Sequence, residues 1–308
     1  MPQFDVLIIG RSCLDHIAVV KQLPEENRKV PLERRLSEGG GQGSTAACCV
    51  ARLGGRPLYV GKLGDDPEGR FCRQRLEDFG VGTEMVETVA GGCTPVAYVL
   101  VTRDSGARTI VYEPSRLPPM ELQPDLQRRI GEAAVILLDP ETTYLAEALA
   151  VYKGPQTVVV YDCERWRRGI EAMMETADYF VPSAEFLQDP VLGLAERSFA
   201  EQLQGLQDRV RGQLVVTAGE YGAYYAIRQT WYQVGIPAVA VADTIGAGDN
   251  FHAAFAYALR QGFDLHRAVR LAVAVASLSC REYGGRNGLP DWQEALATAD
   301  RLRPQVFG

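Results

Sequence analysis

Residues 243–255 read DTIGAGDNFHAAF, a glycine-rich turn that runs into the start of a helix. Gly246, Ala247 and Gly248 have almost no side chain, and the apolar residues that follow recur at helical spacing. The first amides of a helix have no partner inside the helix, and the helix dipole adds partial positive charge there. We therefore expect an anion to bind at this turn, because the small residues leave the amides uncovered.

Asp249 directly follows these small residues. A carboxylate beside a bound phosphate is useful if it takes a proton from a hydroxyl that attacks the phosphorus. The segment thus predicts phosphoryl transfer, with Asp249 as general base and the amides of residues 246–249 as the anion hole. The alternative interpretation is an ordinary capping aspartate beside glycines that let helices pack. His252 lies on the helix behind Asp249 and is expected to pack or to support it.

A second glycine cluster, EGGGQGSTAA, covers residues 38–47. It contains a formal match to the dinucleotide fingerprint G-x-G-x-x-A, beginning at Gly41, but ERRLSE precedes it where the fingerprint needs an apolar strand. Two interpretations stay open. The segment is either a flexible turn that caps a helix through Ser44 or Thr45, or a loop where a ligand approaches the backbone closely.

The composition is that of an ordinary soluble protein, with 308 residues, 46% of them apolar and 23% charged. A net charge of −7 argues against a nucleic-acid partner. The seven cysteines form no C-x-x-C pair, so we expect structural thiols in a reducing cytoplasm. The first apolar run, residues 6–9, is too short for a signal peptide or a membrane span. The chain also has no P-loop sequence.

The hydrophobic pattern predicts an α/β protein with a mostly parallel central sheet flanked by helices. Apolar, β-rich runs alternate with helix-length segments, as in βαβ units. Buried strands are expected at residues 4–10, 57–64, 133–139, 157–162 and 213–219, and helices at residues 44–55, 67–80, 259–280 and 291–302 and after Asp249.

Two further stretches predict a separate sheet. Residues 12–37 contain runs in which apolar and polar residues partly alternate, and residues 94–114 read as a hairpin around the turn sequence of residues 104–106. Half-exposed strands of this kind suit a small β-sheet lid over a site at the strand ends. We expect one domain, residues 1–308, that includes this lid.

Together these features resemble the PfkB or ribokinase-like family of carbohydrate kinases over nearly the whole chain. Residues 243–251 match the family's C-terminal signature D-T-x-G-A-G-D-x-F, which is highly specific. Gly40, Gly41 and the sequence ARLG at residues 51–54 match its N-terminal signature. Asp15 stands at the position of the early aspartate that grips sugar hydroxyls in the family.

The resemblance implies ATP-dependent phosphorylation of a primary alcohol on a sugar-like substrate. It implies Mg²⁺ entering with ATP, held mainly by phosphates and water. It also implies a monovalent cation such as K⁺ near the carbonyls of Asp243 and Thr244, and a homodimer formed through the lid. The residues that it places along the nucleotide are Thr217, Gly219, Gly222, Gly285 and Asn287.

The chain departs from the family pattern at two positions. Thr45 stands where the family has an asparagine that touches the sugar. Ser183-Ala184-Glu185-Phe186 replaces the N-x-x-E motif that organises Mg²⁺ and phosphate, so only Glu185 can serve there.

Within the family the chain is most similar to sulfofructose kinases and then to ketohexokinases. Lys29 matches a lysine that the former use near the substrate anion, but Tyr112 and Glu141 stand where their asparagine and arginine sulfonate ligands are expected. With Asp15, Glu113 and Glu141 on the sugar side, an anionic sugar would be repelled, so we predict a neutral ketose such as fructose. The alternatives are a sulfofructose, fructose-phosphate or nucleoside kinase and, outside kinases, an NAD-dependent oxidoreductase or a silent sugar-binding regulator.

Overall fold

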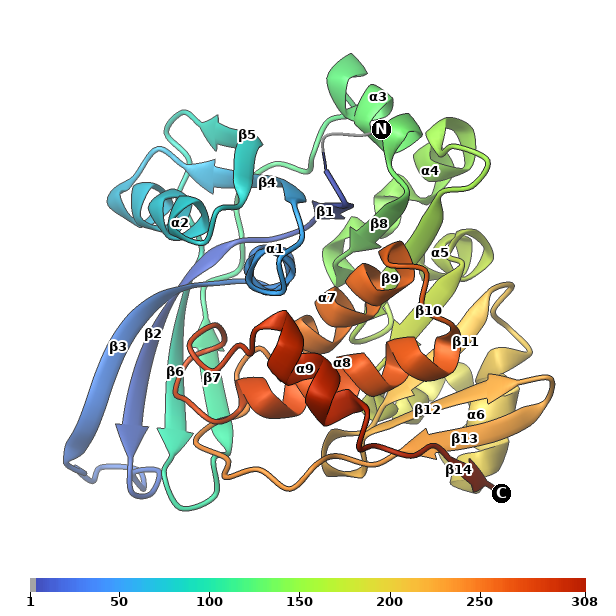
Figure 1. Cartoon of the computed structure of the whole chain (residues 1–308). Coiled ribbons are helices and arrows are strands. Elements are labelled where there is room, and N and C mark those ends of the chain that lie inside the picture. Colours follow the sequence, from blue (N-terminus) through green and yellow to red (C-terminus); the bar gives the residue numbers. More distant parts are fainter. Residues whose placement is uncertain (1–3) are drawn as a thin grey trace.

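The computed structural model describes residues 4–308, whose strands form a ten-stranded and a four-stranded sheet (Figure 1). In spatial order the larger sheet contains β14 (Gln305–Phe307), β13 (Thr230–Val234), β12 (Ala223–Ile227), β11 (Gln213–Thr217), β10 (Tyr179–Pro182), β9 (Val158–Cys163), β8 (Val135–Leu138), β1 (Val6–Ile9), β4 (Pro57–Gly64) and β5 (Gly82–Val89). All neighbouring pairs from β5 to β11 run parallel, as expected, whereas β12, β13 and β14 pair antiparallel at one edge.

Helices cover both faces of this sheet and bury separate cores. Alternate side chains of a strand point to opposite faces, so Val6 and Ile8 of β1 enter one core and Leu7 and Ile9 enter the other. The first core also contains residues of α1 (Gln42–Arg52), α2 (Pro67–Asp78), α7 (Ala247–Arg260), α8 (Leu265–Ser279) and α9 (Trp292–Ala299). The second contains residues of α3 (Pro124–Glu132), α4 (Ala146–Tyr152), α5 (Ile170–Thr176) and α6 (Phe199–Gln207).

The helix expected over residues 259–280 begins later than predicted. Gly262 has φ 76°, which ends α7, and Asp264 accepts a hydrogen bond from the Arg267 amide to begin α8 at Leu265. A glycine and a capping aspartate thus divide one apolar pattern into two helices. Within residues 4–308, every helix is too short or too polar to span a bilayer.

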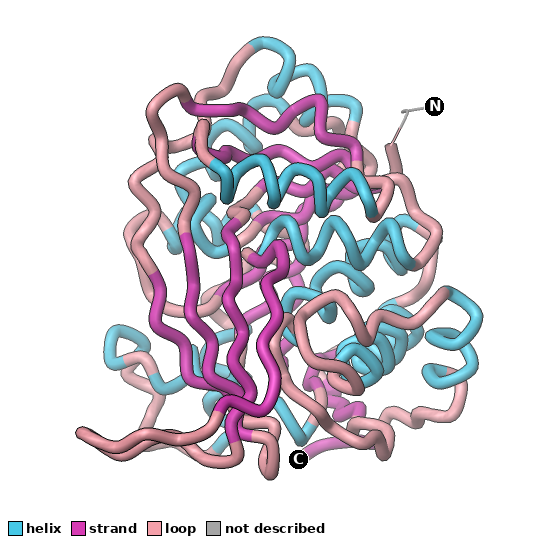
Figure 2. Tube along the Cα trace, turned by 90° about the vertical axis from the view of Figure 1, so that its left-hand side faces the viewer, coloured by secondary structure: helices cyan, strands magenta, loops and turns pink. Residues whose placement is uncertain are grey.

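The smaller sheet stands beside the body as a lid, at the left of Figure 1, and Figure 2 shows its strands side by side facing the viewer. Its strand order is β3 (Leu32–Gly40), β2 (Cys13–Val20), β6 (Val96–Thr102) and β7 (Arg108–Tyr112). Ile17, Val99 and Val101 form a small core that packs against Ile245, just before the glycine-rich turn. The lid is thereby fixed beside the start of α7.

The parallel strands bring several polar loops to one edge of the large sheet. Arg11 follows β1, Asp139 follows β8, Asp162 lies near the end of β9 and Thr217 ends β11. The carboxyl ends of neighbouring parallel strands meet at the same edge, which is where α/β proteins bind ligands.

Candidate active site

A cavity of about 670 Å³ lies between this edge of the sheet and the lid. Its volume suits a small-molecule ligand site. Many of its lining residues are polar or charged, and they come from the strand ends, from the lid and from the start of α7. They include Arg11, Cys13, Asp15, Gly41, Arg108, Tyr112, Glu113, Asp162, Glu164, Arg165, Glu185, Thr217, Gly246, Gly248, Asp249 and His252.

The glycine-rich turn forms one wall of this cavity. Gly246 has φ 70°, and a Cβ on it would lie 2.9 Å from the Cα of Gly285, so both backbone conformation and packing require glycine there. Apart from its chain neighbours and the backbone of its own helix, a Cβ on Gly248 would meet no atom of residues 4–308 within 4 Å. Gly248 therefore leaves free space at the start of α7, in the direction of the cavity.

Asp249 lies at the same end of α7 and faces the cavity. Burial, and next the charge of Asp162, raise its pKa to about 7, although His252 and Arg108 oppose the shift. A carboxylate with a pKa near neutrality is ionised in part at pH 7 and binds a proton more readily than an ordinary aspartate. This is the property that a general base needs.

Asp15, on β2, lies across the cavity in the lid. The Cys13 thiol donates a hydrogen bond to its Oδ1 at 3.1 Å. A Cβ on Gly40 would overlap the Asp15 carboxylate, so that glycine makes room for it. Gly41 has φ 92°, and a Cβ on it would lie 2.7 Å from the Arg11 carbonyl oxygen. The second glycine cluster thus holds the carboxylate and the loop after β1 close together.

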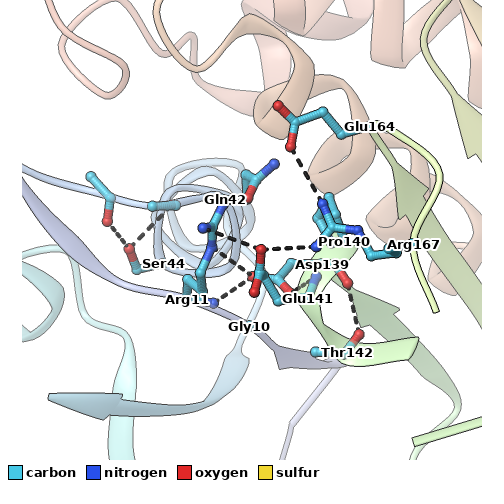
Figure 3. Close-up of polar contacts among 12 residues, drawn as sticks. Gly10, Arg11, Gln42, Ser44, Asp139, Pro140, Glu141, Thr142, Glu164 and Arg167 are labelled. Carbon is cyan, nitrogen blue, oxygen red and sulfur yellow. Dashed lines mark hydrogen bonds and ion pairs between the residues drawn. The ribbon is translucent and has the colours of Figure 1, made fainter. Parts of the chain in front are cut away.

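A polar network supports the cavity at the strand ends (Figure 3). The backbone amide of Arg11 donates to Asp139 Oδ2 at 2.6 Å, and the guanidinium of Arg11 donates to Gln42 Oε1 at 2.5 Å. Glu141 is held between Arg11 Nη1, at 3.4 Å, and Arg167 Nη1, at 2.8 Å. Burial opposes the ionisation of Glu141, but Arg167 and Arg11 outweigh it and lower its pKa.

The loop before α7 is fixed by side chains of the protein. The Asp243 carboxylate accepts hydrogen bonds from the amides of Ile245, at 2.8 Å, and Gly284, at 2.7 Å. Arg108, on the lid, donates to the Thr244 hydroxyl at 2.6 Å. Thus the lid and the loop after α8 both contact the turn that carries Asp249.

A comparison with known proteins identifies the family. The model of the pfkB family carbohydrate kinases matches residues 3–292. The chain belongs to this family. It is 26% identical over 306 residues to a ribokinase of Lactococcus lactis, covering 98% of this chain and 99% of the relative. It is 26% identical over 327 residues to 5-dehydro-2-deoxygluconokinase 1 of Bacillus cereus, covering 97% and 96%.

A solved structure of Arabidopsis thaliana ribokinase, complexed with ribose and ATP, has the same fold with a TM-score of 0.80. It is 25% identical in sequence and covers 96% of this chain and 98% of that one. The expected carbohydrate kinase and ribokinase-like fold are therefore confirmed. The strand before the G-x-G-x-x-A match is β3, at the edge of the lid, so this glycine loop lacks the structural setting of a dinucleotide fingerprint.

Several residues expected at the site lie outside the cavity lining. Lys29 lies in the exposed loop between β2 and β3. Thr45 is buried in the first turn of α1, and its methyl group lies 3.2 Å from the place of a Cβ on Gly246, so it packs against the glycine-rich turn. Glu141 was expected to face the sugar, but the structure turns it toward two arginines and it does not line the cavity.

The residues expected along the nucleotide divide into two groups. Thr217 and Glu185, which lies in the short 3-10 helix η2 (Ala184–Gln188), line the cavity. Gly219 and Gly222 lie just beyond Thr217, in the turn between β11 and β12. A Cβ on Gly222 would overlap the Val234 carbonyl, so close packing against β13 requires this glycine.

Gly285 and Asn287 belong to the loop after α8 and do not line the cavity. The Gly285 carbonyl accepts a hydrogen bond from the Asn250 side chain at 2.9 Å. The side-chain amide of Asn287 donates to the Tyr283 carbonyl at 2.8 Å and to the Glu38 carboxylate. Both residues hold this loop against its neighbours, and their role toward a nucleotide stays a prediction.

Sequence reasoning missed the arginines of the site and two acidic residues. Arg11, Arg108 and Arg165 line the cavity, as do Asp162 and Glu164. Asp162 is the last residue of the strand expected over residues 157–162, and Glu164 follows it by two positions. Their place at the carboxyl end of a parallel strand was the signal that could have pointed to them. Arg108 comes from the lid, and only the folded arrangement brings it to the turn before α7.

Proposed function

We propose that this kinase transfers the terminal phosphoryl group of ATP to a primary hydroxyl of a neutral ketose such as fructose. One observation carries the proposal: Asp249, with a pKa near 7, lies beside the open space at Gly248 and faces the same cavity as Asp15. A base, a place for an anion and a hydroxyl acceptor thus face one cavity. We propose that they belong to a single domain, residues 1–308.

Each group has a defined role in this reaction. Asp15 accepts hydrogen bonds from sugar hydroxyls, because an ionised carboxylate has two strong acceptor oxygens. Asp249 removes the proton of the attacking sugar hydroxyl. The hydroxyl oxygen then bonds to the terminal phosphorus of ATP, and the bond between this phosphorus and the departing ADP breaks. The amides at residues 246–249 donate to the oxygens of the phosphoryl group in transfer, where charge stabilisation has its largest effect.

ATP use is supported by family membership and by the ATP bound to Arabidopsis ribokinase. We place the nucleotide along Thr217 and the turn at Gly219 and Gly222, with the loop of Gly285 and Asn287 behind it. Glu185 lines the cavity with a carboxylate, which fits Mg²⁺ because hard cations prefer oxygen ligands. The metal would neutralise phosphate charge when bound.

The substrate preference follows from the groups that face the sugar. Asp15 and Glu113 line the cavity, whereas the Arg11 guanidinium already contacts Gln42 and Glu141. We therefore expect kcat/KM for fructose to exceed that for fructose 6-phosphate or sulfofructose by at least about tenfold, or about 1.4 kcal/mol. An ADP-release screen over ketoses, ribose, sugar acids, sugar phosphates and nucleosides measures this directly.

The same screen is able to reject the neutral-ketose assignment. Arg108 and Arg165 line the cavity as well. If an anionic sugar is the best substrate, these arginines, and not Asp15 and Glu113, dominate recognition. If a nucleoside is the best substrate, the reaction type stands and the sugar assignment fails.

A monovalent cation is proposed at the carbonyls of Asp243 and Thr244, where it would support the turn before α7. Replacing Na⁺ by K⁺ at fixed ionic strength is then expected to raise kcat. The Asp243 carboxylate already ties this loop to Ile245 and Gly284. Equal rates in the two salts would show that these contacts hold the loop without an ion.

We also propose a homodimer that forms through the outer face of the lid. Leu32, Tyr98 and Val111 are exposed there, along a groove of about 690 Å³. Exposed apolar surface of this kind is typical of protein interfaces.

We also propose a cytoplasmic location. The seven cysteines are free thiols, which suits the reducing environment of the cytoplasm.

A further inference from the structure

Both ring nitrogens of His252 face carbonyl oxygens. Nδ1 lies 2.6 Å from the carbonyl oxygen of Gly248, and Nε2 lies 3.0 Å from that of Val181 at the end of β10. A carbonyl oxygen only accepts, and a neutral imidazole has one N–H donor and one bare nitrogen. In a neutral ring, one of these contacts would bring a lone pair against a carbonyl oxygen. Both contacts are hydrogen bonds only if the ring carries two protons.

Carboxylates near the ring compensate such a charge. His252 is 4% exposed, and its Nε2 lies 3.5 Å from Asp162 Oδ1. A small cavity of about 10 Å³ is lined by His252, Asp162, Asp249 and Asp139, so three aspartates lie around the same space. Burial raises the pKa of all three, and a positive ring beside them favours their ionised forms. A buried cation needs such partners, because nothing else in the interior replaces its hydration. Burial lowers the pKa of His252 below its ordinary value, although the two carbonyls and Asp249 favour the charged form. The charge of the ring is therefore inferred from the two carbonyl contacts, which a neutral ring cannot both make as hydrogen bonds.

Asp249 is surrounded by charges of both signs. Asp162 on β9 and Asp15 on β2 favour its protonated form, whereas His252 on its own helix and Arg108 on the lid favour its ionised form. His252 and Asp249 therefore bind protons as a coupled pair. A positive His252 makes the ionised Asp249 more stable, and an ionised Asp249 is the form that accepts a proton from a hydroxyl.

We propose that His252 is a positioning residue, held as an imidazolium by the Gly248 and Val181 carbonyls, whose charge keeps Asp249 ionised. The inference rests on the proposed role of Asp249 as general base. His252 keeps its two protons during the reaction, and the proton of the sugar hydroxyl goes to Asp249. Since Gly248 belongs to the proposed anion hole, the ring also ties that turn to β10.

Nitrogen NMR of the ¹⁵N-labelled wild-type protein tests the charge of the ring without any assay of activity. The chain has three histidines, and a His252→Asn variant assigns the signal. At about pH 7.5 an ordinary histidine, with a pKa of about 6.5, is mainly neutral. We expect both nitrogens of His252 to have the shifts of protonated nitrogens at this pH. One protonated and one bare nitrogen would overturn the proposal.

The pH dependence of kcat/KM tests the effect on Asp249. A nearby opposite charge typically lowers a carboxyl pKa by about 1–3 units. The acid limb of the profile is therefore expected to move up by about one pH unit or more in His252→Asn, because Asp249 then binds its proton more tightly. His266→Asn is the matched control, since His266 contacts Tyr225 and Tyr232 away from the cavity, and its limb is expected to stay in place.

An acid limb unchanged in His252→Asn, in a folded variant, would remove the positioning role. If that variant does not fold, the wild-type nitrogen spectrum alone decides whether the ring is charged. Failure of the proposed function has a different signature. Asp249→Asn would then stay active, whatever the nitrogen spectrum of His252 shows.

Discussion

Replacing Asp249 by asparagine is expected to lower kcat by roughly 10²–10⁴, the usual contribution of a positioned general base. Asparagine has nearly the same shape but does not accept the hydroxyl proton. The raised pKa of Asp249 means that its ionisation opposes folding above the unfolded-state pKa, so the neutral variant should not lose melting temperature at pH 8. ATP affinity is expected to stay close to that of the wild type.

The wild-type pH profile belongs to the same prediction. Because the pKa of Asp249 is about 7, the base is protonated below that pH and kcat/KM should fall as the pH drops through 7. Asp264→Asn is a suitable control, since Asp264 caps α8 and asparagine also caps helices. Activity of Asp249→Asn within a few-fold of the wild type would exclude Asp249 as the base.

Replacing Gly248 by valine is expected to lower kcat by roughly 10²–10³, the scale of losing an anion-hole donor. The new side chain would project into free space at the start of α7, where the phosphoryl oxygens must meet the backbone amides. Apart from its chain neighbours and the backbone of its own helix, no described atom lies within 4 Å of a Cβ at this position, so the melting temperature should change little.

Gly235 offers a matched control for this substitution. A Cβ there also meets nothing within 4 Å among residues 4–308, but Gly235 is exposed and does not line the cavity. Gly235→Val should therefore keep both stability and activity. A folded Gly248→Val variant with nearly full turnover would show that phosphate does not approach this part of the turn.

The parallel strands β1, β4, β8, β9 and β11 could be predicted because they are apolar, bounded by glycine or polar residues and separated by helices. The short strand β10, with four residues, and the antiparallel edge β12–β14 could not be predicted in the same way. The parallel strand β5 could not be predicted either, because its sequence GTEMVETV is mostly polar. Edge pairing depends on contacts far apart in sequence, such as β13 with β14.

The residues of the site also divide into those that could be predicted from the sequence and those that could not. The glycines and Asp249 could be predicted, because a motif and the physics of helix starts both point to them. The environment of Glu141 could not, because its charge is compensated by Arg11 and Arg167, which are distant in sequence. The contact of His252 with the Val181 carbonyl likewise appears only in the folded chain, since Val181 lies 71 positions away.

Proton-coupled ³¹P NMR of the reaction product tests the central claim most directly. The enzyme, ATP, Mg²⁺ and the best ketose of the screen are incubated, and the new phosphate ester is observed. Transfer to a primary alcohol predicts a triplet, because the phosphorus couples to the two protons of a methylene group, and this signal should be absent with Asp249→Asn over the same time. A doublet or an uncoupled singlet would place the phosphate on another carbon, and ADP release without any ester signal would contradict sugar phosphorylation.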